Sequence, residues 1–170
     1  MNHSTLLNRI VDLSIPLLNK IPQSIFHEKP SLEKWSKKEI LGHLIDSAFN
    51  NHRRVMRSLD QNDLNFDGYN QNLWVATNNY QGRTHLDVIT LWESCNKHFA
   101  NAIDQIGQDH VNKLTTNHNF HLIGMHAIAE GSKANLSYLI WDYINHLEHH
   151  LSQIIPNYHR INEAAPNLES

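Results

Sequence analysis

The chain has 170 residues and a formal net charge of −3, and 40% of its residues are hydrophobic. This length fits one domain with an adequate core, and we interpret residues 1–170 as a single domain because no linker, low-complexity tract or internal repeat interrupts them. Lysine and arginine are scattered along the chain, which argues against a nucleic-acid partner. The single cysteine, Cys95, excludes an intramolecular disulfide framework and a multi-thiolate metal site.

The N-terminal stretch from Met1 to Lys20 is apolar only at helical intervals. Because Asn, Arg and Asp lie among its leucines, it lacks the continuous apolar run of a signal peptide or a membrane span. We therefore expect no membrane association and a cytoplasmic location.

The first two helices are predicted from apolar residues spaced three and four apart. One should run from about Ser4 to Asn19, with Pro16 as a point where it is kinked or interrupted. The next should begin at Ser36 and continue to about Leu59. Glu39 follows Ser36 by three residues, which is the pattern of a capping box at a helix N-terminus.

A long connection, residues 60–83, separates the second helix from the third. It contains the turn pair Asp67-Gly68 and three bulky aromatic residues, Tyr69, Trp74 and Tyr80. Connections of this length are usually functional or disordered, and the aromatic residues argue against disorder. The third helix should run from about Thr84 to Ile106, because apolar residues recur there at helical spacing and Gly107 favours a stop.

Residues 108–131 have no assigned role, and Phe120 to Ile128 fits either a short pair of strands or a helical turn. The last helix should start after Ser132 or Asn135 and end at Ile155, because Pro156 cannot continue it. Together these elements predict an all-α fold.

Histidine is the conspicuous residue, with 14 in the chain. His146 and His150 are four apart in the last helix, so both side chains lie on one face and can reach a single ion. His149 should project away from the apolar stripe toward solvent. A pair at this spacing also arises by chance in a chain so rich in histidine, so the pair alone does not establish a metal site.

The second helix supplies a candidate third ligand, His43, at the start of a polar line that continues through Ser47, Asn50 and Arg54. Facing helices of a bundle commonly build metal sites from inward side chains, and imidazole suits zinc, nickel, iron or copper. Three imidazoles without a thiolate leave coordination positions for water or substrate. We expect surface or hydrogen-bonding roles for the remaining histidines.

Five further residues have candidate roles, and two interpretations are open for four of them. Asp46 either orients a ligand or faces solvent, and its helical position lies closer to solvent. Asn51 points to the apolar side, where a structural role is favoured over ligand orientation. Tyr143 lines a cavity or packs, and Gln153 can form a hydrogen bond near the site. Cys95 lies between apolar residues of its helix, so a buried thiol is favoured over a nucleophile.

Two stretches of the sequence carry a family resemblance. Residues 34–54, KWSKKEILGHLIDSAFNNHRR, resemble the second helix of the DinB-like, or YfiT-like, metal-dependent hydrolases, and residues 138–154, YLIWDYINHLEHHLSQI, resemble their last helix. The resemblance covers nearly the whole chain. It implies a four-helix bundle with a long crossover connection between helices 2 and 3, a divalent metal bound by His43, His146 and His150, and a homodimer.

The function implied by the resemblance is that of a metal-dependent enzyme with a small-molecule substrate. It is either an S-transferase that activates a low-molecular-weight thiol or a hydrolase, with zinc or nickel as the favoured metal. The alternative is a non-catalytic binding or stress-response protein whose metal is structural. No general base is identified from the sequence.

Overall fold

Four long helices form the protein, and the computed structural model describes residues 2–161 and 164–168. They are α1 (His3–Asn19), α3 (Lys37–Arg57), α5 (His85–Asp104) and α8 (Leu136–Ile154), each within a few residues of its predicted bounds. No β-strand forms in the described ranges, which contain only isolated bridges. The predicted all-α fold is therefore confirmed.

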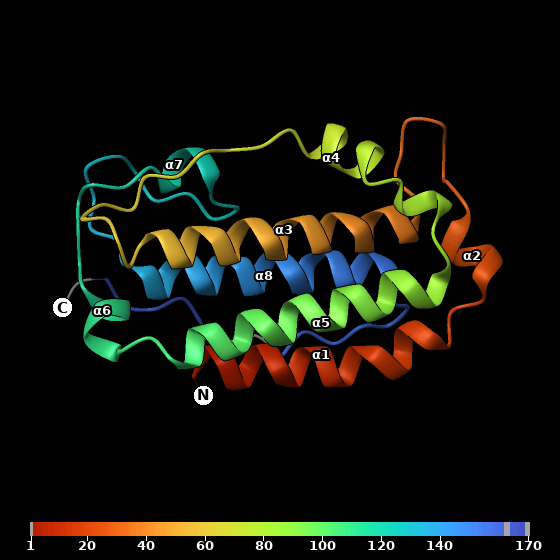
Figure 1. Cartoon of the computed structure of the whole chain (residues 1–170), viewed down its shortest axis with the longest axis horizontal. Helices are drawn as coiled ribbons and strands as arrows, with labels where there is room; N and C mark the ends of the chain where they lie inside the picture. Colours follow the sequence, from red (N-terminus) through yellow and green to blue (C-terminus); the bar gives the residue numbers. More distant parts are fainter. Residues whose placement is uncertain (1, 162–163, 169–170) are drawn as a thin grey trace.

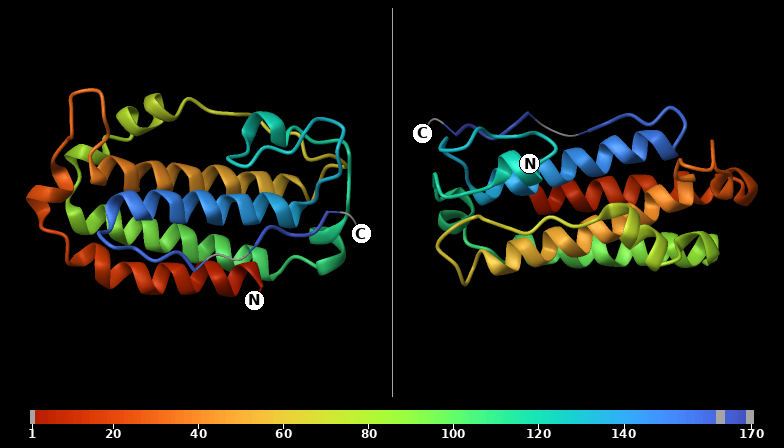
Figure 2. Two further views of the ribbon diagram at one scale, coloured as in Figure 1. Left: turned by 180° about the vertical axis from the view of Figure 1, so that it is seen from behind. Right: turned by 90° about the horizontal axis from the view of Figure 1, so that it is seen from above.

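The four helices pack as a bundle in which α1 and α3 each contact both α5 and α8 (Figures 1 and 2). Every helix contributes fully buried side chains to one apolar cluster, for example Leu7, Leu44, Trp92 and Leu147. Burial of these faces supplies the main favourable free energy of folding. Within the described residues, no helix is both long and apolar enough to cross a bilayer.

The helix ends follow the sequence closely. Ser36 and Glu39 form the predicted capping box, with the Ser36 amide 2.8 Å from the Glu39 carboxylate and the Glu39 amide 3.1 Å from the Ser36 hydroxyl. A kink or an interruption was expected at Pro16, and the interruption is wrong, because α1 continues past this residue to Asn19. Pro16 and Asp12 lie on the exposed face, so water can bind the Asp12 carbonyl group that Pro16 leaves without a helical donor.

Helices α3 and α5 run in the same direction, so the chain between them returns along the length of the bundle (Figure 1). This connection holds two short helices, α4 (Gln71–Thr77) and the 3-10 helix η1 (Tyr80–Gly82). Its main anchor is the buried Tyr80, whose ring lies against Gly42 of α3. A Cβ atom at Gly42 would lie 2.2 Å from this ring. Glycine is therefore required at this contact.

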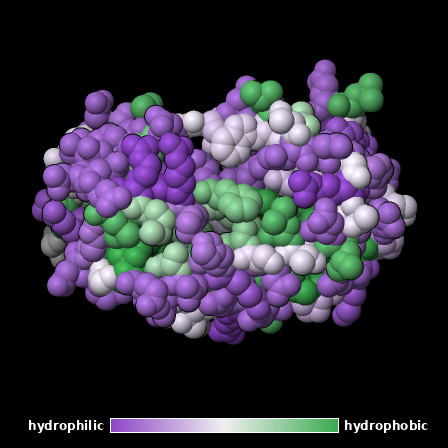
Figure 3. All heavy atoms as spheres, viewed as in Figure 1, coloured by the Kyte–Doolittle hydropathy of each residue, from purple (hydrophilic) through white to green (hydrophobic). Residues whose placement is uncertain are grey.

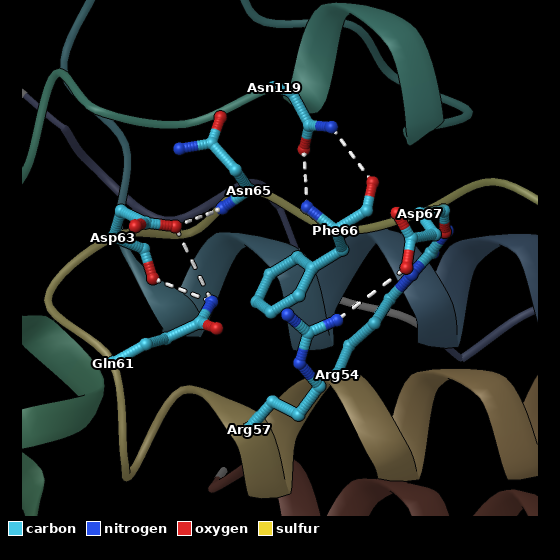
Figure 4. Close-up of polar contacts among 8 residues, drawn as sticks. All are labelled: Arg54, Arg57, Gln61, Asp63, Asn65, Phe66, Asp67 and Asn119. Carbon is cyan, nitrogen blue, oxygen red and sulfur yellow. Dashed lines mark hydrogen bonds and ion pairs between the residues drawn. The ribbon is translucent and has the colours of Figure 1, made fainter.

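Three more short helices complete the fold, α2 (Gln23–His27), α6 (Gln108–Asn112) and α7 (Phe120–Ile123). Residues 120–128, for which either a pair of strands or a helical turn was open, thus contain a helical turn, α7. The residues before it hold the crossover connection in place. Asn119 accepts a hydrogen bond from the Phe66 amide at 3.0 Å and donates one to the Phe66 carbonyl at 2.8 Å, as Figure 4 shows.

Candidate metal centre

Three histidine rings meet where α3 packs on α8. His43 lies on α3, and His146 and His150 lie one turn apart on α8. The Nε2 atoms of His43 and His146 are 3.1 Å apart, and one nitrogen from each of the three rings lies within 4.8 Å of the others. Two imidazole nitrogens bound to one zinc ion lie roughly 3.3 Å apart. The three rings therefore have a spacing that fits a single ion after small side-chain adjustments.

The two adjacent histidines at the end of α8 make different contacts with the side chain of Gln153. Its Oε1 atom accepts a hydrogen bond from Nδ1 of His150 at 2.9 Å, which leaves the Nε2 lone pair of His150 free for a metal ion. Its Nε2 atom lies 3.0 Å from Nε2 of His149. His149 is half-buried, beside Arg160, and lies outside the three-histidine cluster.

Burial keeps the three rings uncharged at neutral pH. It lowers the pKa of His43 to about 4, with a smaller contribution from the nearby His150. The pKa of His146 is well below its ordinary value for the same reason, and burial also lowers that of His150. Neutral imidazole is the form that binds metal ions. The Nδ1 atoms of His43 and His146 are buried and have no hydrogen-bond partner in the described part of the chain.

The prediction that the side chain of Asp46 lies near solvent is wrong. This side chain is buried and accepts hydrogen bonds from the Tyr80 hydroxyl at 2.7 Å and the Asn78 amide at 2.8 Å. The crossover connection covers this side of α3, which helical periodicity alone does not reveal. Asp46 therefore anchors the crossover and is not part of the cluster with His43.

A cavity of about 380 Å³ lies beside the histidine cluster and shares His146 with it. This volume is within the usual range for small-molecule sites. Short stretches of the crossover and of residues 122–125 complete its wall. The helices α3 and α8 provide the lining residues Ser47, Asn51, Arg54, Asp142, Tyr143 and His146.

The polar residues of α3 that line the cavity therefore include Asn51, whereas the sequence suggested Asn50. Asn51 lies two turns after His43, and its Oδ1 atom accepts a hydrogen bond from Arg54 at 3.2 Å. Tyr143 both lines the cavity and packs, because its hydroxyl donates to buried Asn96. Cys95 is buried as predicted, and burial raises its pKa to about 12, so it stays a thiol.

Sequence reasoning missed Asp142, a buried carboxylate in the cavity wall. It accepts hydrogen bonds from the amides of Met125 at 2.9 Å and His126 at 2.7 Å, and from Nδ1 of His126 at 2.9 Å. The signal was its position one helical turn before His146, on the same face of α8. Asp142 fixes the loop that closes one end of the cavity.

The protein is an all-α bundle with three inward histidines on facing helices, an arrangement from which helical-bundle proteins commonly build metal sites. The sequence profile of the DinB superfamily matches residues 6–154. The chain belongs to this superfamily, as its two histidine-bearing stretches suggested.

One solved structure is similar over most of the chain. It is YfiT from Bacillus subtilis, described as a probable metal-dependent hydrolase with an unusual four-helix bundle topology. The match has a TM-score of 0.69 and 14% sequence identity, and it covers 89% of this chain and 81% of YfiT. At this identity the likeness establishes the shared fold. A comparison with curated proteins finds no significant match.

Proposed function

We propose that the protein is a metal-dependent enzyme that acts on a small molecule, with one divalent ion, zinc or nickel, held by His43, His146 and His150. The observation that carries the proposal is the convergence of three neutral imidazoles at the wall of a cavity. In the described residues, no fourth histidine, cysteine or carboxylate joins the cluster. Such a ligand set leaves room for water or substrate, as in catalytic sites.

A bound ion would lower the pKa of a coordinated water molecule or thiol. The first effect would assist hydrolysis, and the second would assist thiol transfer. The chain's own residues position the substrate. Ser47 and Asn51 offer polar side chains along the cavity, and Tyr143 is held rigid by its hydrogen bond to Asn96. Buried groups of this kind can orient a bound molecule because packing restricts their rotamers.

The proposal is tested by presenting the metal-loaded protein with two substrate panels. One panel pairs low-molecular-weight thiols with electrophiles, and the other contains small esters and amides. We expect turnover in one panel and its loss in the His146→Ala variant, which removes one ligand. Turnover that is absent from both panels, or equal in the variant, would favour a structural metal in a non-catalytic binding or stress-response protein.

We also propose that two copies of the chain associate in the cytoplasm. Apolar side chains are exposed on α3 and just after it, with Phe49 52%, Met56 40% and Leu59 44% exposed. Figure 3 shows apolar surface over α3 and α5, bordered by polar residues. Burial of such a patch favours self-association. Sedimentation should show a dimer in the native protein and a shift toward monomer in Phe49→Glu; a monomeric native protein would contradict this part.

A further inference from the structure

We infer that the molecule bound in the cavity carries an oxyanion, a carboxylate or a phosphate, and that Arg54 is the residue that binds it. This inference rests on the proposed function only in calling that molecule a substrate. It assigns a second contact point in the cavity, distinct from the histidine cluster.

The guanidinium of Arg54 is buried without a carboxylate partner. The residue is 7% exposed and lines the cavity. One terminal nitrogen donates to Oδ1 of Asn51 at 3.2 Å and the other to the carbonyl oxygen of Asp67 at 2.9 Å, while Nε has no partner in the described ranges. Guanidinium has five N–H donors. Most of the hydrogen-bonding capacity of Arg54 is therefore unused.

A purely structural role does not account for this charge. Both partners of Arg54 are neutral oxygens, which a neutral donor could satisfy without the free-energy cost of burying a cation. Asp67 also has a second arginine contact, at the surface. A side-chain nitrogen of Arg57 lies 3.7 Å from the Asp67 carboxylate, as Figure 4 shows. A buried guanidinium is suited to binding a planar or tetrahedral oxyanion through two parallel hydrogen bonds.

No carboxylate that lines the cavity makes a direct ion pair with Arg54, although Asp142 and Asp67 act on its charge from further away. Asp142 is the only acidic residue among those that line the cavity, and its carboxylate already accepts three N–H donors from Met125 and His126. No ion pair between Asp142 and Arg54 forms. A divalent ion at the histidines would add further positive charge. Because Asp142 is hydrogen-bonded to other groups, the guanidinium of Arg54 stays available to an added anion.

The geometry of α3 connects this anion site to the histidine cluster. His43, Ser47, Asn51 and Arg54 follow one another at steps of four, four and three residues, so they share a helix face. The first and last are about 16 Å apart along the axis, and helical side chains lean toward the N-terminus, which brings the guanidinium closer to His43. A small molecule bound at Arg54 would extend along Ser47 toward His146, within a cavity of about 380 Å³.

The test is calorimetric titration of the purified full-length protein with three probes of similar size: butyrate, inorganic phosphate and neutral butyramide. Each titration is made with the protein as isolated and after metal removal, so that direct binding of an anion to the metal ion is recognised. The variants are Arg54→Gln, which removes the charge, and Arg54→Lys, which keeps it. Arg57→Gln is the matched control, because it removes an arginine one turn further along α3 that lies near the same Asp67.

We expect metal-free native protein to bind at least one anion roughly tenfold or more tightly than butyramide, and Arg54→Gln to lose this preference while Arg57→Gln keeps it. Arg54→Lys should retain part of it. Preference for butyrate would identify the group as a carboxylate, and preference for phosphate as a phosphate. Equal binding of the anions and butyramide, equal loss in Arg57→Gln, or no binding at all would overturn the inference.

A second readout needs no variant. The side-chain N–H resonances of Arg54 in the native protein should shift on titration with the bound anion and not with butyramide; unchanged resonances would overturn the inference even if Arg54→Gln failed to fold. Metal content separates this result from the proposed function. A native protein that binds no divalent ion but binds anions through Arg54 would refute the enzyme proposal and leave the anion site intact.

Discussion

The two halves of the bundle differ in what they bury. Helices α1 and α5 meet mainly through apolar side chains, with one hydrogen bond from Ser4 to Asp104 at 2.8 Å and one ion pair between Asp12 and Lys97. Asn96 is the only polar side chain among the buried residues of α5. Helices α3 and α8 instead bury His43, Asp46, Arg54 and Asp142. Burial of polar and charged groups reduces stability unless each finds a partner. The comparison indicates that the α1/α5 half mainly stabilises the fold, while the α3/α8 half holds the candidate site.

The strongest test of this division concerns metal content. We predict that His146→Ala and His150→Ala each lose nearly all bound metal, because two imidazoles hold an ion much less tightly than three. Elemental analysis of purified protein measures this. His149→Ala is the matched control on the same turn of α8 and should retain the metal, since His149 lies outside the cluster. Equal loss in all three variants would refute the assignment of ligands.

A core substitution on the other half should have the opposite effect. Phe99 of α5 is fully buried, so Phe99→Ala should lower the free energy of unfolding by about 3–5 kcal/mol while metal content per folded molecule is unchanged. Urea denaturation and elemental analysis measure the two quantities. Leu86→Ala, at a position of α5 that is 66% exposed, should change stability by less than about 0.5 kcal/mol. Loss of metal in folded Phe99→Ala would show that the halves are not separable.

The contact between Gly42 and Tyr80 tests how the crossover is held on α3. Gly42→Ala should lower the free energy of unfolding by about 1–3 kcal/mol, because the new methyl group would displace the Tyr80 ring. Gly68→Ala is the control, since no atom lies within 4 Å of the Cβ position there. Urea denaturation compares the two. A variant as stable as the native protein would mean that the ring moves aside at little cost.

The smallest expected effect concerns the bonds between Asn119 and Phe66. Asn119→Ala removes two hydrogen bonds to backbone groups of the crossover and should cost about 1–2 kcal/mol of local stability. Hydrogen exchange of the Phe66 amide should accelerate accordingly, while amides in α1 exchange as in the native protein. Unchanged exchange at Phe66 would show that the neighbouring bond from Leu64 to Asn117 holds the segment alone.

Amphipathic periodicity is a local signal, and it predicted the four helices; helical spacing likewise predicted that His146 and His150 share one face. The meeting of His43 with this pair was expected chiefly from the family resemblance, because the packing of two distant helices is not a local property. Periodicity failed at Asp46, since it predicts one buried face whereas every residue of α3 from 41 to 48 is buried. The crossover connection covers the second face of α3 and so buries residues that periodicity places at the surface. The choice of Asn51 over Asn50 depends on loops whose paths the sequence does not specify. Asp142 had a signal in its position one turn before His146, but its loop partners Met125 and His126 did not.

The cavity wall combines two kinds of element with different freedom to change. The histidines stand on long helices, whereas residues near 68–71 and 122–125 lie in connections. Connections tolerate insertions and replacements far better than packed helices do. Exchange of these two loops between superfamily members would therefore change the lining of the cavity while the histidine cluster stays intact.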